Sequence, residues 1–193
     1  MKNGRRARRA SSVLDEWIQE LGRRLGKKPR NLPPLCPAGQ VHDLTELFTA
    51  VLEQDLDPEE RARLSSPSLT WGRLTRQARR SLQLGSYDSE LGLIRIHPIL
   101  DQDGVPDWFV RFVLFHEVLH ALYPPRSSTG KRKLHHPPEF LAREELHPDH
   151  GRANKWQAET IAALLRSLRT GRPLGRRHKR ASTKNLLQRF LFD

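Results

Sequence analysis

The spacing of hydrophobic residues predicts a helix-rich chain. Apolar side chains recur at helical spacing after Ser11 or Ser12, either of which can serve as N-cap, until Gly26 and Pro29 end the pattern. A proline-rich linker follows, and residues 41–52 then give a second amphipathic pattern. We expect both helices to serve as scaffold.

The middle of the chain combines strand patterns with one strongly apolar helix. Residues 68–75 alternate loosely between apolar and polar side chains, and residues 91–96 are rich in β-forming residues, with a turn pattern over 87–92 between them. These segments predict a small antiparallel sheet. After Pro106, a favourable first helical residue, residues 108–122 are apolar almost all round, which places this helix in the middle of the core.

Two more helical patterns lie near residues 139–146 and 149–168. Together these elements predict an α+β fold, with a small antiparallel sheet packed on a central helix and further helices before and after it. A chain of 193 residues has room for one domain of ordinary size with extensions. The predicted parts are a disordered basic arm (1–10), N-terminal helices with a linker (11–67), the core (68–170) and a basic tail with an apolar end (171–193).

The composition limits the chemistry. No apolar run approaches the roughly 18 residues that a membrane-spanning helix needs, and the arginine-rich N-terminus lacks the apolar segment of a secretory signal. We therefore expect a soluble, cytoplasmic protein without a membrane partner. A single cysteine, Cys36, excludes an internal disulfide and a zinc site built from several cysteines, whereas nine histidines leave a site of histidines and carboxylates open.

The net charge of +12 is concentrated at the two ends of the chain. Residues 1–30 carry ten basic and three acidic side chains and residues 166–193 carry nine and one, whereas residues 31–165 carry 15 and 18. Such basic arms can bind DNA through its phosphates, independently of sequence, or they can be solvated tails. The residues concerned are Arg5, Arg6, Arg8, Arg9, Arg176, Arg177, Lys179 and Arg180.

The sequence His116-Glu117-Val-Leu-His120 carries the strongest chemical signal. Positions i and i+4 share one face of a helix, so both imidazoles can reach one metal ion. Zinc held by such a pair and a third protein ligand keeps a position open for water and lowers the pKa of that water. Glu117 can accept the proton as the water attacks a carbonyl. We therefore predict His116 and His120 as zinc ligands and Glu117 as general base, the alternative being a hydrogen-bonded cluster without metal.

The third ligand has several candidates. We favour His136, because it stands at the start of the short helix that follows the loop, and Phe140 on the same face can anchor that helix against the core. The other candidates are His135, His147 and His150, with Glu139, Glu144, Glu145 and Glu159 as carboxylate options.

Several stretches around this motif match one known family. They are Trp71-Gly-Arg, Leu84-Gly-Ser-Tyr87, Ile94-Arg-Ile-His-Pro98, Leu100-Asp101, Val113-Leu-Phe-His-Glu-Val-Leu-His120 and His136-Pro-Pro-Glu-Phe140. With them the chain resembles the SprT-like (Spartan-type) zinc metallopeptidases and their small minigluzincin-like bacterial relatives. The resemblance covers about residues 68–168 and leaves the N-terminal helices and both basic arms unexplained. In the family the last motif usually reads His-Gly-Pro-Glu-Phe and its histidine is the third zinc ligand, which carries over to His136, although Pro137 replaces the glycine.

The resemblance implies a mixed α+β metallopeptidase core, with zinc between the active-site helix and the next helix. It also implies a protein or peptide substrate, and some members of the family cut proteins that are crosslinked to DNA. Because a strand of the family commonly edges the cleft, residues 91–97 could accept an extended peptide by strand addition. His97, Tyr87 and Tyr123 are further candidates near the chemistry, although a structural role suits each of them better.

The sequence thus predicts a zinc-dependent metallopeptidase. Two alternatives stay open. One is a non-catalytic DNA- or RNA-binding protein in which the same residues hold a structural zinc, and the other is a metal-dependent hydrolase of a non-peptide substrate. Glu117→Gln separates the first alternative from an enzyme, because the metal and the fold should persist in both and only an enzyme would lose an activity.

Overall fold

The structure is a computed structural model, and it describes residues 32–74, 82–126 and 134–175. Contacts divide the chain into two units, residues 1–33 and residues 34–193, and the fold belongs to the second unit. The first predicted helix and the basic residues of both arms lie outside the described residues. No helix in the described part of the chain is long and apolar enough to cross a membrane.

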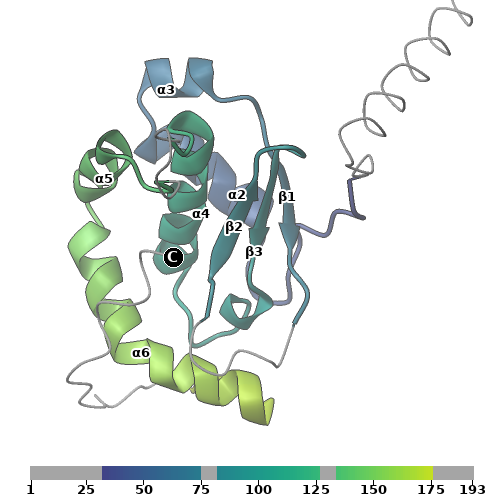
Figure 1. Cartoon of the computed structure of the whole chain (residues 1–193). Helices are drawn as coiled ribbons and strands as arrows, with labels where there is room; N and C mark the ends of the chain where they lie inside the picture. The colour runs from purple at the N-terminus through teal and green to yellow at the C-terminus, as the bar shows by residue number, and fades with distance from the viewer. Residues whose placement is uncertain (1–31, 75–81, 127–133, 176–193) are drawn as a thin grey trace, which may run out of the picture. The chain divides into compact units, whose positions relative to one another are not determined.

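A three-stranded sheet forms one layer of the second unit (Figure 1). Its order is β1 (Ser68–Trp71), β3 (Leu93–Ile96) and β2 (Gly85–Asp88), so β3 is the central strand. β2 pairs antiparallel with β3, but β1 runs parallel to it. The sheet is therefore mixed, and not antiparallel as predicted. The two parallel strands are neighbours in the sheet but not in sequence, since the chain between them includes the whole of β2.

Strand β2 includes residues that the sequence assigns to a turn. Tyr87 and Asp88 belong to β2, and the turn occupies residues 89–92. Asp88 stabilises this turn, because its Oδ1 accepts hydrogen bonds from two backbone N–H groups there, at 3.2 and 3.3 Å. Gly92 ends the turn with a φ of 57°, a conformation that glycine adopts readily. The β2 sequence has little strand pattern of its own, so pairing with β3 decides its conformation.

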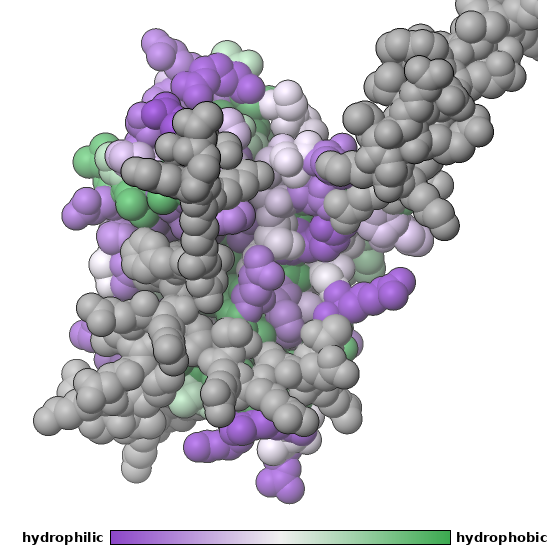
Figure 2. Space-filling model, viewed as in Figure 1, coloured by the Kyte–Doolittle hydropathy of each residue, from purple (hydrophilic) through white to green (hydrophobic). Residues whose placement is uncertain are grey.

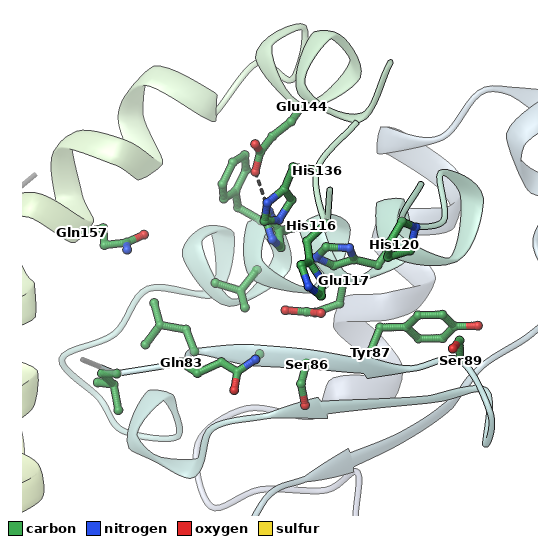
Figure 3. Close-up of a pocket in the computed structure, with 17 residues that line it drawn as sticks. Gln83, Ser86, Tyr87, Ser89, His116, Glu117, His120, His136, Glu144 and Gln157 are labelled. Atoms are coloured by element: carbon green, nitrogen blue, oxygen red, sulfur yellow. Dashed lines mark hydrogen bonds and ion pairs between the residues drawn. The ribbon is translucent and has the colours of Figure 1, made fainter. Parts of the chain in front are cut away.

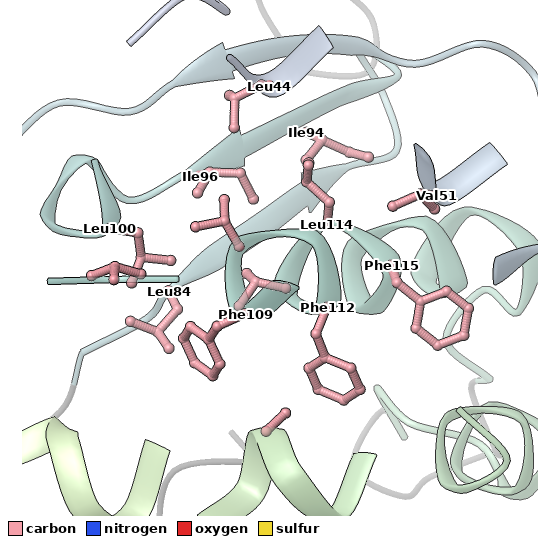
Figure 4. Packing of buried hydrophobic residues seen from close by; sticks show 14 of the residues in the cluster. Leu44, Val51, Leu84, Ile94, Ile96, Leu100, Phe109, Phe112, Leu114 and Phe115 are labelled. Carbon is pink, nitrogen blue, oxygen red and sulfur yellow. The ribbon is translucent and has the colours of Figure 1, made fainter. Parts of the chain in front are cut away.

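The central helix α4 (Asp107–Leu122) packs directly against the sheet. Ten of its 16 residues are buried, as its apolar pattern predicts. Leu114 lies beside Ile94 of β3, whereas Phe109 and Phe112 point away from the sheet toward the later helices (Figure 4). Because α4 is enclosed on both sides, the direction of its few polar side chains is fixed by apolar packing.

Further helices enclose α4 and complete the α+β fold, whose class is confirmed. Helix α2 contacts both α4 and β1, and Leu44, Phe48 and Val51 belong to the same buried cluster as α4. Residues 44–56 therefore contribute to the same core as the described residues of 68–170. The elements around α4 are α2 (Leu44–Ala50), the π-helical turn η1 (Val51–Asp55), α3 (Pro58–Arg63), the 3-10 turn η2 (Pro98–Leu100), α5 (Pro138–Glu145) and α6 (His150–Thr170).

Candidate metal centre

Three histidines from two parts of the chain meet beside α4 (Figure 3). His116 and His120 lie one turn apart on α4, and His136 lies just before α5. One nitrogen from each ring lies within 4.8 Å of those of the others, and the ring centroids are between 4.8 and 5.2 Å apart. These are the three histidines that the sequence predicts as ligands, and together they could hold one metal ion.

Local structure brings His136 back to α4. Backbone hydrogen bonds of 3.1 and 3.0 Å between Arg126 and Leu134 close the loop that leaves α4. Pro137 then takes an extended conformation, with φ −66° and ψ 162°, and α5 begins at the next residue. Phe140 in the first turn of α5 packs against all three imidazoles, at centroid distances of 4.6 to 5.0 Å. The aromatic anchor that the sequence suggests for this helix therefore supports the histidine rings themselves.

The other candidates for the third ligand lie elsewhere. His135 is exposed at the edge of the cavity described below, and His150 belongs to the first turn of α6. His147 is buried, with its Nε2 3.2 Å from Oδ1 of Asp55. Among the described residues, only His136 joins the pair on α4. Of the carboxylate candidates, Glu139, Glu145 and Glu159 are exposed.

Burial and mutual repulsion keep two of the imidazoles neutral. Burial first, and then the positive charge of His116, lowers the pKa of His120 to about 3 and the pKa of His136 to about 4. Both rings are therefore neutral near pH 7 and can offer a nitrogen lone pair to a cation.

His116 differs because Glu144 of α5 lies beside it. Its Nδ1 is 2.6 Å from Oε1 of Glu144. Burial lowers the pKa of His116, but the hydrogen bond to Glu144 and the charges of Glu117 and Glu144 outweigh burial, and the net pKa is raised. At Glu144 burial acts upward, yet the same hydrogen bond makes the net pKa lower than usual. An Nδ1–H that donates to Glu144 leaves Nε2 of His116 for a metal ion, as is common for ligating histidines.

Glu117 is held between α4 and β2. Only 4% of the residue is exposed, and burial raises the pKa of Glu117 to about 7, although the charge of His116 and the backbone N–H of Tyr87 act in the opposite direction. Gly85 of β2 lies very close, because a Cβ there would stand 2.5 Å from Oε1 of Glu117 and 2.8 Å from its Cγ. Only a glycine at position 85 leaves Glu117 in this place without a shift of the strand or the side chain.

These side chains line a cavity of about 390 Å³ between α4, β2 and the start of α5. Figure 3 shows Ser86 and Tyr87 of β2 across from the histidines, with Gln83 and Gln157 toward the other end. β3 is bonded to a strand on each side, so the prediction that residues 91–97 accept a peptide was wrong. β2 is the strand at the edge of the sheet and next to the cavity.

Two of the further candidates have the structural roles that the sequence favours. Nδ1 of His97 accepts a hydrogen bond from the backbone N–H of Ile99 at 3.0 Å, which begins the turn η2. The hydroxyl of Tyr123 donates to Glu60 at 3.1 Å. Neither residue lines the cavity, whereas Tyr87 does.

Two residues have roles at the site that the sequence did not suggest. Glu144 was a possible ligand, and it instead contacts a ring nitrogen of His116. Gly85 stands in one of the stretches that carry the family resemblance, but the pattern gives no reason for it. The only available signal was a glycine inside a short, half-buried segment, which often marks a close approach of backbone and side chain.

No protein-family model, curated protein or solved structure matches this chain. The basic arm residues proposed for nucleic acid, from Arg5 to Arg9 and from Arg176 to Arg180, lie outside the described residues. The geometry of the histidine cluster therefore carries the functional argument.

Proposed function

We propose that this protein is a zinc-dependent metallopeptidase. One observation carries the proposal: three imidazoles converge next to buried Glu117, in a cavity bordered by an edge strand of the sheet. The resemblance of residues 68–168 to SprT-like metallopeptidases, which depends partly on the same side chains, supports it.

The donor set suits zinc. His116, His120 and His136 would hold the ion, and Glu144 would orient His116. Three histidine ligands leave one position of a tetrahedral site open, as catalytic zinc sites require. A Zn²⁺ ion held there would lower the pKa of a bound water molecule and polarise the carbonyl of the peptide bond that is to be cleaved.

Glu117 is the general base in this proposal. Its side chain extends from α4 toward β2 and lines the same cavity as the three histidines (Figure 3). The carboxylate accepts a proton from the attacking water and can return it to the departing amine. Because Gly85 lets the carboxylate lie against β2, the base stays next to the strand along which a peptide would bind.

The edge of β2 supports an extended peptide as the substrate. The backbone N–H of His97 donates to the carbonyl of Leu84 at 2.8 Å, and the register pairs Ser86 with Arg95. In an antiparallel ladder the bonding direction alternates, so the backbone groups of Gly85 and Tyr87 point away from β3. The N–H of Tyr87 faces Glu117, so a peptide would add to the backbone of Gly85 and the carbonyl of Tyr87, which would bring its own carbonyl close to Glu117 and the histidines.

The test compares matched variants of tag-free protein, because the histidines of a tag would bind zinc themselves. Wild type, His136→Ala and His135→Ala are dialysed identically, and their metal content is measured by mass spectrometry. Zinc near one equivalent in wild type and in His135→Ala, with marked loss in His136→Ala, is expected. Cleavage of a fluorogenic peptide library should then fall about 10²- to 10⁴-fold in Glu117→Gln, which keeps its zinc.

Either half of this experiment can reject the proposal. A wild type that binds no zinc even after zinc is added back would exclude the mechanism. Stoichiometric zinc without cleavage of any peptide would favour a structural zinc site, or a hydrolase of some other carbonyl substrate.

We propose contact with nucleic acid as a second candidate function, supported by the charge of α6. Arg152, Lys155, Arg166 and Arg169 are exposed and, at helical spacing, lie on the side of α6 opposite its buried residues. Glu159 is the only acidic residue of this helix. Such a row of positively charged side chains suits the phosphates of a nucleic acid and would extend the contacts proposed for the two basic arms.

Salt dependence tests the second candidate. Binding of a fluorescent DNA oligonucleotide should weaken steeply between low and moderate salt, and deletion of residues 1–10 and 171–182 should remove most of it, leaving only the contacts of α6. Replacement of Arg166 and Arg169 by Gln should lower the salt slope by about one for each lost phosphate contact, whereas the same change at Arg61 and Arg73 should not. Unchanged binding by the truncated protein would contradict the role of the arms.

A further inference from the structure

Helix α3 contacts the rest of the fold through hydrogen bonds and an ion pair of its charged side chains. Of its six residues, all of which the structure describes, only Glu60 is buried, with 3% of the residue exposed. Figure 2 shows hydrophilic residues over the part of the surface where α3 lies. A helix without an apolar stripe cannot be positioned by hydrophobic packing. Its polar contacts must therefore explain where it sits and what it does.

The carboxylate of Glu60 binds two other parts of the chain and the start of its own helix. It accepts hydrogen bonds from Nε and Nη2 of Arg143 on α5, at 2.7 and 2.9 Å, and from the hydroxyl of Tyr123 after α4, at 3.1 Å. It also accepts from the backbone N–H of Asp57, at 3.1 Å, as part of a capping box. A single buried carboxylate thus connects α3 with both helices next to the histidine cluster.

Arg143 makes this connection relevant to the candidate metal centre. It precedes Glu144, whose carboxylate contacts His116, and α5 also carries Phe140 beneath the three rings. Besides Glu60, the guanidinium of Arg143 donates to the backbone carbonyl of Asp55 and lies 5.1 Å from the ring centre of Phe115. The position of α5 along α4 is therefore fixed by Arg143 at the residue next to Glu144.

A second contact of α3 holds the end of α4. Nη2 of Arg63 donates to the backbone carbonyl of Leu122 at 3.1 Å, and the guanidinium lies 5.7 Å from the ring centre of Tyr123. Leu122 is the last residue of α4 and stands two residues after His120. An arginine at the free carbonyls of a helix end is favourable in itself. Here it ties the same short helix to the segment that carries His120.

We infer that Glu60 and Arg143 are positioning residues of the metal centre. Their ion pair sets the place of α5 against α4, and with it the point from which Glu144 holds His116 and Phe140 supports the rings. This inference rests on the proposed zinc site. It assigns a role to residues 55–63, which lie outside the stretch that resembles the SprT-like family. A buried ion pair is weak evidence of stabilisation, because apolar residues of similar volume often stabilise a fold as well or better.

The experiment distinguishes an effect of Glu60 and Arg143 on the zinc ligands from their effect on the stability of the fold. Arg143→Met leaves Glu60 buried without its main partner and should lower the unfolding temperature, whereas the double variant Glu60→Met with Arg143→Met should recover part of the loss. Zinc affinity, measured by competition with a chromophoric chelator, should stay about 10- to 100-fold weaker in both variants. The visible spectrum of bound Co²⁺ should change in both, because it reports the arrangement of the ligands.

Arg111→Met is the matched control. Arg111 pairs with Asp55 at 2.8 Å and its side chain is 23% exposed, against 19% for Arg143, but it does not contact α5 through this pair. It should lower the unfolding temperature while zinc affinity and the Co²⁺ spectrum stay as in wild type.

The outcomes are distinct. Zinc affinity that returns to the wild-type value in the double variant would overturn the positioning role while leaving the metal centre intact, and so would an equal loss of affinity in Arg111→Met. Absence of metal binding in wild type would overturn both this inference and the proposed function.

Discussion

Two clusters of buried and half-buried polar side chains, both of which include residues of α4, differ in what holds them together. In the paired cluster, which comprises Asp55, Glu60, Arg111 and Arg143, each charged side chain has a partner of opposite sign within 2.8 Å. In the histidine cluster, which comprises His116, His120 and His136, three groups of the same kind meet, and burial and their neighbours lower the pKa of His120 to about 3. The first cluster is held by its own attractions. The second gains from its arrangement only when a cation is bound.

This difference predicts that substitutions in the paired cluster change the free energy of unfolding, whereas substitutions in the histidine cluster change the response to metal. Loss of a partner in the paired cluster leaves a buried charge uncompensated and should appear as lost stability, with or without metal. Loss of His120 or His136 removes a group that carries little charge near pH 7, so the fold should persist while the response to metal disappears.

The largest expected effect is on the paired cluster. Arg111→Met removes the positive charge beside Asp55 and leaves a carboxylate whose side chain is only 2% exposed without its cation. We expect the free energy of unfolding to fall by about 3–5 kcal/mol, as is typical when one partner of a buried pair is removed. Denaturant unfolding should give the same loss in zinc and in chelator. A larger loss in zinc would mean that the Asp55–Arg111 pair, like the Glu60–Arg143 pair, also acts on the histidine cluster.

Zinc itself should stabilise the histidine cluster. At free zinc about 100 times the dissociation constant, wild type should gain about 2.7 kcal/mol of unfolding free energy, because the ion binds only the folded chain. His120→Ala should show no gain, whereas His135→Ala, which alters an exposed neighbour outside the cluster, should gain as wild type does. An equal gain in His120→Ala would place the ion elsewhere on the protein.

Glu117 offers a sharper test, because its position requires a residue without a side chain at position 85. Gly85→Ala places a methyl carbon 2.5 Å from Oε1 of Glu117, which is too close, so the carboxylate must move. We expect peptide cleavage to fall about 100-fold, the cost of an error of roughly 1 Å at a reacting group, while zinc content is unchanged. Gly151→Ala, with nothing within 4 Å, is the control and should be fully active. Full activity of Gly85→Ala would mean that the position of Glu117 does not matter for cleavage, which contradicts its role as general base.

The sequence predicted the elements whose own pattern is strong. The apolar run of α4 and the amphipathic α5 and α6 were found within one or two residues of their observed ends, because burial at helical spacing is a local signal. β2 and the direction of β1 were missed, since pairing with β3 decides both. α3 was also missed, although the capping box of Asp57 and Glu60 was a readable sign of its start.

The residues of the candidate site also differ in whether local sequence or tertiary packing determines them. His116 and His120 follow from the i, i+4 rule, because both belong to one helix. The choice of His136 over His135 needed Phe140 and the family resemblance, since adjacent residues cannot be separated by spacing alone. Glu144 could be recognised only as an acidic residue, because its contact with His116 depends on how α5 packs against α4.

Glu144 also provides the smallest and most local test of the comparison. Glu144→Gln keeps the volume and one acceptor oxygen but removes the charge 2.6 Å from Nδ1 of His116. We expect zinc affinity to fall about 10- to 100-fold, as is usual when a carboxylate behind a ligating histidine is replaced. Unfolding without metal should lose less free energy than in the paired cluster, because the pKa of His116 falls when Glu144 no longer raises it and the ring can become neutral. Glu145→Gln, an exposed neighbour on the same helix, should bind zinc as wild type does. If the two variants bind zinc equally well, His116 needs no carboxylate behind it, and the histidine cluster is oriented by Phe140 and the helix backbone alone.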